Sequence, residues 1–154
     1  MNNKFSKLIY FIVCFAFFLF CDMFFTKQLY LNVSAGNVFS SKLLDVTYVK
    51  NTGAAFNILT DAREFLIILA VVVLTLLFLY VIKNLKSIWM KEIFFISLLC
   101  AGIFGNLHER IVLGYVRDFF HLNFINFPVF NISDVFINVA VISLITIILL
   151  KKTK

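Results

Sequence analysis

Charged residues are scarce in this chain of 154 residues. Asp, Glu, Lys and Arg together make up 14% of the sequence, 62% of the residues are hydrophobic, and the mean hydropathy is +1.01. A soluble domain carries about a quarter charged residues and only about half apolar ones. The shortage of charge therefore excludes an ordinary soluble domain and predicts a polytopic membrane protein.

Proline, glycine, cysteine and histidine are also rare. One proline and five glycines leave no room for a flexible linker, so we interpret the whole chain, residues 1–154, as a single domain. Cys14, Cys21 and Cys100 all lie in apolar runs and show neither a disulfide framework nor metal-ligand spacing. His108 and His121 lack the HExxH spacing of a zinc site. We therefore expect no metal and no other cofactor.

Long hydrophobic runs are what the chain has in abundance. They predict four membrane spans, at about residues 8–25, 65–82, 88–108 and 133–150. The first run follows Lys4 and Lys7, as in a secretory signal peptide, but no small-residue cleavage site follows it. We therefore read it as a retained span. Asp22 and Lys27 near its outer end are expected to pair with each other or with other outer charges.

The net charge of +6 is distributed unevenly along the chain. The two termini and the connection between the second and third spans hold most of the lysines, namely Lys4, Lys7, Lys83, Lys86, Lys91, Lys151, Lys152 and Lys154. Short loops rich in lysine and arginine stay in the cytoplasm. This pattern predicts that both termini are cytoplasmic, and it argues against a nucleic-acid partner.

The outer connection, residues 28–64, contains two local signals. Residues 43–50 (LLDVTYVK) are rich in residues that favour β structure, which predicts a short strand. The stretch NTGAAF at 51–56 follows, and its small side chains allow a backbone or ligand to approach closely. Taken alone, this second stretch is equally typical of an ordinary turn.

Two aspartates stand out in the last third of the chain. Asp118 lies among aromatic residues expected at the membrane surface, and Asp134 opens the fourth apolar run. In a helix beginning near Asn131, positions 131, 134 and 138 share one face. Ionisable groups at membrane depth are costly and usually functional. Two carboxylates held together share one proton and so provide an acid and a base, which is the chemistry of an aspartic protease.

Other interpretations of these acids must be weighed. Arg110 and Arg117 would neutralise them if the acids only formed salt bridges near the lipid headgroups. A transporter would distribute acids through the membrane depth, whereas here they are predicted to gather at one face. A non-catalytic assembly factor gives no reason for paired acids, and the GxGD signature of other intramembrane aspartic proteases is absent.

Four ordered motifs make the sequence resemble the lipoprotein signal peptidases (signal peptidase II) of bacteria. They are NTGAAF at 51–56, GNLHER at 105–110, VRDFF at 116–120 and FNISD at 130–134. The resemblance implies an all-α membrane protein with four transmembrane helices and a small β-platform on the outer face. It also implies an aspartic endopeptidase of the bacterial inner membrane, with its active site at the outer leaflet. Its partners would be membrane lipids and prolipoproteins, cut just before a diacylglyceryl-modified cysteine.

The same resemblance assigns roles to individual residues. Asp118 and Asp134 would be the catalytic pair. The substrate cleft would be lined or braced by Asn51, Gly53, Asn106, Arg110 and Asn131. The oligomeric state is left open.

Three positions depart from the usual pattern of the family. Glu109 stands where an aspartate is usual, and Ser133 where an alanine is usual. Asp22 precedes Lys27 by five residues rather than four, which turns its carboxylate by about 100° on a helix. The usual structural role of the first-span aspartate is therefore in question here.

Overall fold

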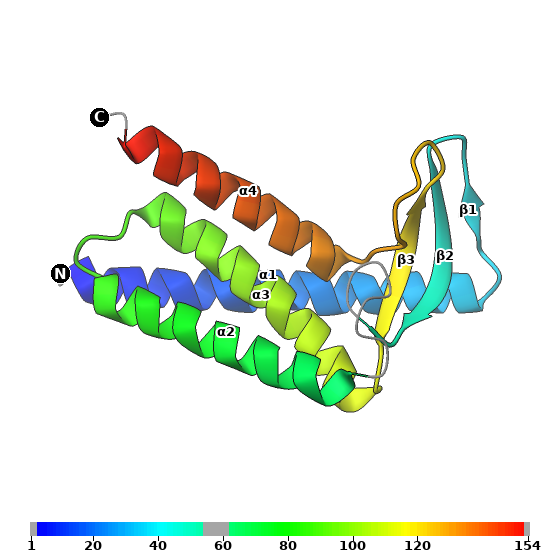
Figure 1. Cartoon of the computed structure of the whole chain (residues 1–154), viewed down its shortest axis with the longest axis horizontal. Helices are drawn as coiled ribbons and strands as arrows, with labels where there is room; N and C mark the ends of the chain where they lie inside the picture. Colours follow the sequence, from blue (N-terminus) through cyan, green and yellow to red (C-terminus); the bar gives the residue numbers. More distant parts are fainter. Residues whose placement is uncertain (1–2, 54–61, 153–154) are drawn as a thin grey trace.

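The computed structural model describes residues 3–53 and 62–152. Within these residues the chain forms four helices and a three-stranded antiparallel sheet. In chain order the elements are α1 (Asn3–Ser34), β1 (Phe39–Ser40), β2 (Leu44–Asn51), α2 (Arg63–Asn84), α3 (Met90–Val112), β3 (Val116–Leu122) and α4 (Ile132–Lys152). Figure 1 shows the sheet at one end of the helices, while α1 begins and α4 ends at the opposite end.

The four helices are long and apolar enough to cross a membrane. They confirm the predicted fold class of four transmembrane helices with a small sheet. The interpretation of residues from 28 onward as a loop was wrong at its start, because α1 continues to Ser34. No glycine or proline interrupts this stretch, and the helix ends just before Gly36, whose φ of 84° is typical of a helix C-terminus.

The sheet has the order β1-β2-β3 and lies over the ends of the helices (Figure 1). Strand β2 confirms the strand predicted at residues 43–50. In the antiparallel register of β2 and β3, Val49 is opposite Asp118 and Asn51 is opposite Val116. An isolated bridge between Phe120 and Phe130 ties the segment before α4 to β3. That bridge brings the start of α4 alongside Asp118.

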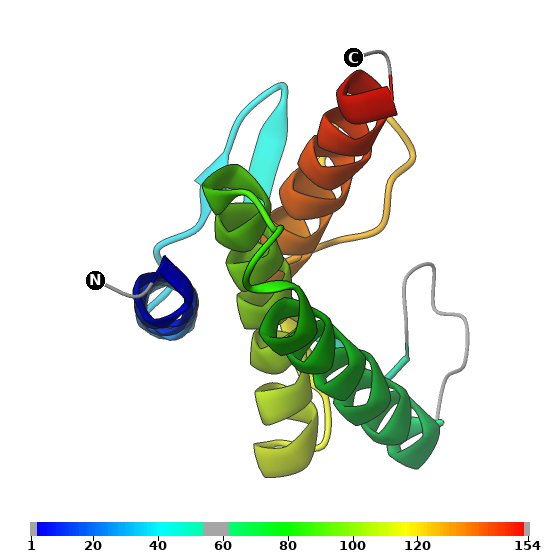
Figure 2. The ribbon, with the colours of Figure 1, turned by 90° about the vertical axis from the view of Figure 1, so that its left-hand side faces the viewer.

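Helix α3 is the centre of the bundle and packs against each of the other three helices (Figure 2). Of its most apolar window, 56% is buried, compared with 11–17% for the other helices. Gly102 permits the close approach of α4, since a Cβ there would lie 2.6 Å from the carbonyl oxygen of Ser133. Small residues allow helices to pack closely in this way in membranes.

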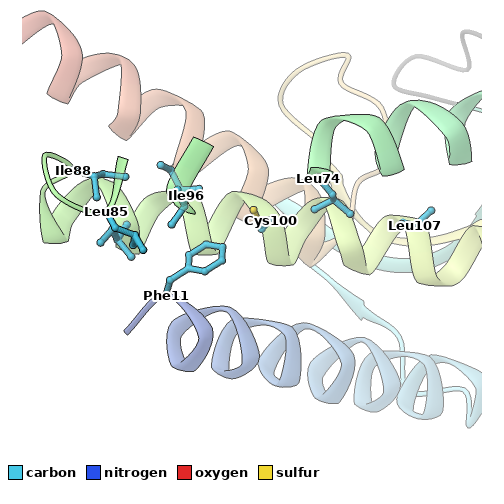
Figure 3. Packing of buried hydrophobic residues seen from close by; sticks show 9 residues of the cluster. Phe11, Leu74, Leu85, Ile88, Ile96, Cys100 and Leu107 are labelled. Carbon is cyan, nitrogen blue, oxygen red and sulfur yellow. The ribbon is translucent and has the colours of Figure 1, made fainter. Parts of the chain in front are cut away.

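The buried apolar cluster runs along α3, and Phe11 of α1 points into it (Figure 3). The Phe11 and Phe78 rings meet edge to face, with centroids 5.1 Å apart, and Phe15 meets Phe78 in the same way at 5.6 Å. Lipid tails are as apolar as these side chains, so the stabilisation comes from close packing rather than from removal of water.

Replacing Phe11 by alanine should therefore destabilise the bundle by leaving a cavity between α1, α2 and α3. We expect a loss of about 3 kcal/mol in the free energy of unfolding, measured by denaturant titration in detergent micelles. Phe20→Ala is the matched control because Phe20 is 65% exposed on the lipid side of α1. Equal losses in the two variants would contradict the packing described here.

Candidate active site

Asp118 lies in the middle of β3 and is only 2% exposed. Its Oδ2 accepts a hydrogen bond from Asn51 Nδ2 at 2.9 Å, and its Oδ1 accepts one from Asn131 Nδ2, also at 2.9 Å. Asn51 reaches the carboxylate because it ends β2, the strand paired with β3. In turn, Asn51 Oδ1 accepts a hydrogen bond from the Gly53 backbone N–H at 2.9 Å. Both oxygens of a buried carboxylate are thus satisfied.

Asp134 occupies the first turn of α4, where it closes a reciprocal cap with Asn131. The Asp134 N–H donates to Asn131 Oδ1 at 2.8 Å, and the Asn131 N–H donates to Asp134 Oδ2 at 3.1 Å. This is the capping-box arrangement, which satisfies two backbone donors at a helix start. Asn106 Nδ2 of α3 donates to the second oxygen, Asp134 Oδ1, at 2.9 Å.

The Asn131 amide joins the two carboxylates. Its Nδ2 donates to Asp118 Oδ1 and also, at 3.0 Å, to Asn106 Oδ1, whose own amide holds Asp134. Each of the four carboxylate oxygens therefore accepts a hydrogen bond within one network of asparagines. The network draws on β2, β3, α3 and the start of α4, so it forms only when all four are in place.

Arg110 borders this network without forming an ion pair with either aspartate in the described residues. Its Nη2 donates to the Gly53 carbonyl at 2.8 Å, and its Nη1 donates to the Asn106 carbonyl at 3.3 Å. Arg110 thus joins the loop after β2 to α3 beside the two acids. Neutralisation of Asp118 and Asp134 by direct salt bridges, the simpler interpretation of the sequence, does not occur among the described residues.

Burial raises the pKa of Asp118 to about 7, and the nearby charge of Asp134 acts in the same direction. Hydrogen bonds from Asn51 and Asn131 and the charge of Arg110 oppose this increase in the Asp118 pKa. A carboxyl group with such a pKa can hold a proton at neutral pH and can also release it. That property suits general acid–base chemistry.

Glu109 and Arg117 hold β3 against the end of α3. Arg117 donates its backbone N–H and its Nε to the two Glu109 carboxylate oxygens, each at 2.7 Å, and its Nη2 lies 2.5 Å from Oε1. Glu109 is 7% exposed, so this is a buried ion pair with several hydrogen bonds. In the sequence, Glu109 stands out as a departure from the family pattern, but no local pattern indicates its partner Arg117, which precedes Asp118.

All five predicted supporting residues, Asn51, Gly53, Asn106, Arg110 and Asn131, join the hydrogen-bond network around the two aspartates. Asn138 does not, since its amide donates to the Asp134 backbone carbonyl at 2.9 Å. Residues 54–56 of the NTGAAF motif lie outside the described residues. In the part of the chain that is described, no group of three or more His, Cys, Asp or Glu is placed to hold a metal ion.

Asp22 does not pair with Lys27 in the described structure. Its Oδ1 accepts a hydrogen bond from Ser133 Oγ at 2.8 Å. This contact links two of the positions at which the sequence departs from the family pattern. Sequence spacing gave no signal for it, because 111 positions separate the two residues.

Comparisons of the sequence with known proteins all identify the same family. The model of the signal peptidase (SPase) II family matches residues 12–150. The lipoprotein signal peptidase of Streptococcus thermophilus (strain CNRZ 1066) is 38% identical over 120 residues, which cover 76% of this chain and 77% of that protein. That of Lactococcus lactis subsp. lactis (strain IL1403) is 34% identical over 135 residues, covering 85% and 87%.

Two solved structures agree with this assignment. A bacterial membrane enzyme determined by the in meso method at 2.3 Å resolution aligns with a TM-score of 0.77 and 32% identity, covering 94% of this chain and 89% of that one. Another, at 1.9 Å resolution, aligns with a TM-score of 0.75 and 30% identity, covering 90% and 92%. The chain belongs to the signal peptidase II family.

Proposed function

We propose that this chain removes the signal peptide from bacterial prolipoproteins, cutting just before the diacylglyceryl-modified cysteine, with Asp118 and Asp134 as its catalytic pair. Membership of the signal peptidase II family, which consists of aspartic peptidases, supports the reaction. The assignment of the pair depends on one observation: a single asparagine network holds all four oxygens of two buried carboxylates.

In the proposed mechanism, water lies between the two carboxyl groups. The ionised aspartate takes a proton from the water, and the water oxygen attacks the scissile carbonyl carbon. The protonated aspartate donates a hydrogen bond to the oxyanion that develops. The C–N bond then breaks, and a proton passes to the nitrogen, which becomes the new amino terminus at the lipidated cysteine. The chemistry uses only the two carboxyl groups and water.

The supporting residues would hold this pair and border the peptide. Asn51, Asn106 and Asn131 orient the carboxylates by the hydrogen bonds described above. Arg110 and Gly53 join the loop after β2 to α3 beside them, and the Arg110 charge favours negative charge nearby. The backbone around Gly53, which is buried, would lie along the substrate cleft.

The position of the acids favours a peptidase over the transporter interpretation. Asp118 and Asp134 meet at the sheet end of the helices, and Glu109 and Asp22 lie at the same end. Glu92 is bound to Lys151 at the opposite end. The acids therefore form no chain through the membrane depth within the described residues, whereas an ion path would require one.

We further propose that the protein lies in the inner membrane with the sheet and the catalytic pair at the outer leaflet, and that both termini are cytoplasmic. The start of α1, the end of α4 and the α2–α3 connection lie at the same end of the molecule (Figure 1), and the lysines concentrate in these segments. The positive-inside rule then assigns that end to the cytoplasm. The diacylglyceryl group of the substrate would rest in the lipid beside the helices.

Asparagine at either acid should abolish cleavage. Asp118→Asn and Asp134→Asn keep the side-chain shape but cannot exchange the proton, so each should reduce kcat by at least about 1,000-fold, and the double variant should be scarcely worse. The assay is cleavage of a diacylglyceryl-modified precursor in detergent. Asp45→Asn is the matched control, since Asp45 bonds Ser40 and Ser41 outside the network. Substantial turnover by either dyad variant would overturn the aspartic mechanism.

The rate should depend on the proton that the pair shares. Because the pKa of Asp118 is raised to about 7, its proton is retained below that pH and lost above it, so kcat should fall as the pH rises through about 7. Asn51→Ala removes a hydrogen bond that lowers this pKa, so its alkaline limb should move to higher pH. The measurement is kcat against pH at saturating precursor, and an unmoved limb would contradict the role given to Asn51.

Reporter fusions test the orientation. Fusions at Asn51 and Asn123 should report an outer location, and a fusion at Lys86 should report the cytoplasm. Alkaline phosphatase and a fluorescent protein, which are active on opposite sides of the membrane, give complementary signals. Phosphatase activity at Lys86 would reverse the proposed orientation.

A further inference from the structure

A buried contact between α1 and α4 lies directly beside the proposed catalytic pair. Ser133 Oγ donates to Asp22 Oδ1 at 2.8 Å, and each of the two residues is 4% exposed. Ser133 immediately precedes Asp134 in the first turn of α4. A shift of Ser133 would therefore displace the carboxylate of Asp134 as well.

Gly105 of α3 makes room for this contact. A Cβ at position 105 would collide with both the Asp22 carboxylate and the Ser133 hydroxyl. The absence of a side chain there allows α1, α3 and α4 to meet at one point. The Asp22 and Ser133 side chains fill the space that a larger residue at position 105 would take. The contact between these two side chains is therefore closely packed against α3.

Asp22 is not enclosed on every side. Together with Lys27, Glu109 and Arg117 it lines a cavity of about 410 Å³ between α1, α3 and β3. Glu109 and Arg117 form an ion pair with each other rather than with Asp22. The Asp22 carboxyl group thus has Gly105 on one side and the cavity on another, and among the described residues it accepts its hydrogen bond from Ser133.

The first turn of α4 is thus held from two sides. Asn131 holds it on the side of the sheet, through the reciprocal cap and the bond to Asp118. Ser133 holds it on the side of α1, through Asp22. Asn106 of α3 also bonds Asp134, so the contact with Asp22 is the hydrogen bond that fixes this turn from the side of α1. The rotation of this turn sets the distance between the two carboxyl groups.

We propose that Ser133 and Asp22 form a positioning pair, which fixes the first turn of α4 and thereby the reactive geometry of Asp134. The inference rests on the proposed function, because it assigns Asp134 to the catalytic pair. The pair touches neither the water nor the peptide. Its loss lowers kcat and leaves substrate affinity and the folded state nearly unchanged.

Ser133→Ala is the primary test because it removes one hydroxyl and adds no bulk. We expect kcat to fall by about 10- to 100-fold, as a displacement near 1 Å at a reacting group produces, with KM near the wild-type value. Cleavage of a diacylglyceryl-modified precursor is measured in detergent across substrate concentrations. Thermal unfolding of the same samples reports the folded state.

Ser97→Ala is the matched control. Ser97 is fully buried in α3, and its hydroxyl donates to the Ile93 carbonyl at 2.8 Å and the Phe11 carbonyl at 3.3 Å. It therefore also connects α1 to a neighbouring helix, but far from the aspartates along α3. This variant should change thermal stability as little as Ser133→Ala does and keep the wild-type kcat.

Variants at Asp22 separate the hydrogen bond from the charge. Asp22→Asn keeps an oxygen that accepts from Ser133 and should retain most of the wild-type kcat, whereas Asp22→Ala should match the loss in Ser133→Ala. The double variant Asp22→Ala/Ser133→Ala should be no slower than either single variant, because one contact is lost in all three.

The outcomes are distinguishable. Wild-type kcat in Ser133→Ala, or an equal fall in Ser97→Ala, would overturn the positioning pair. So would losses that multiply in the double variant. If Asp118→Asn and Asp134→Asn keep their turnover, the proposed function itself fails. If they lose it while Ser133→Ala does not, only the positioning inference fails.

Discussion

The architecture of the site depends on the side-chain amide of Asn131. That one group caps α4 through its oxygen and donates through its nitrogen to Asp118 and Asn106. The cap would form in many helices, but here the capping carboxylate is also one of the proposed catalytic acids. Local helix chemistry and the geometry of the acid pair are therefore the same set of hydrogen bonds, and neither can change without the other.

Burying two carboxylates is costly, and the surrounding fold offsets that cost in a specific way. Neither acid forms an ion pair among the described residues, because Arg117 pairs with Glu109 and Arg110 donates to backbone carbonyls. Neutral amides satisfy the oxygens instead. Amides leave the Asp118 pKa near neutrality, whereas a direct ion pair would lower it and remove the proton. The amide hydrogen bonds therefore both satisfy the buried carboxylate oxygens and leave Asp118 able to exchange a proton.

Packing and chemistry are separated along the bundle axis. The half of the molecule away from the sheet is held by aromatic contacts around Phe11 and by the Lys151–Glu92 ion pair. Polar contacts gather at the sheet end, where the three helices α1, α3 and α4 approach through Gly102 and Gly105. Helix α3 spans both halves and is the most buried of the four helices. Its packing therefore also fixes where Asn106 and Glu109 lie at the site.

The four apolar helices and the strand at 43–50 could be predicted from the sequence, because hydropathy and β-propensity are local properties. Short motifs likewise named the residues that we propose for the site. The interpretation of a helix beginning near Asn131 is confirmed by α4, which begins at Ile132. The pairing of residues far apart in the sequence follows from the packed fold instead. The Glu109–Arg117 and Asp22–Ser133 contacts, and the antiparallel register that sets Asn51 beside Asp118, join elements brought together by packing. Such contacts depend on helix rotation and strand register, which no local pattern specifies.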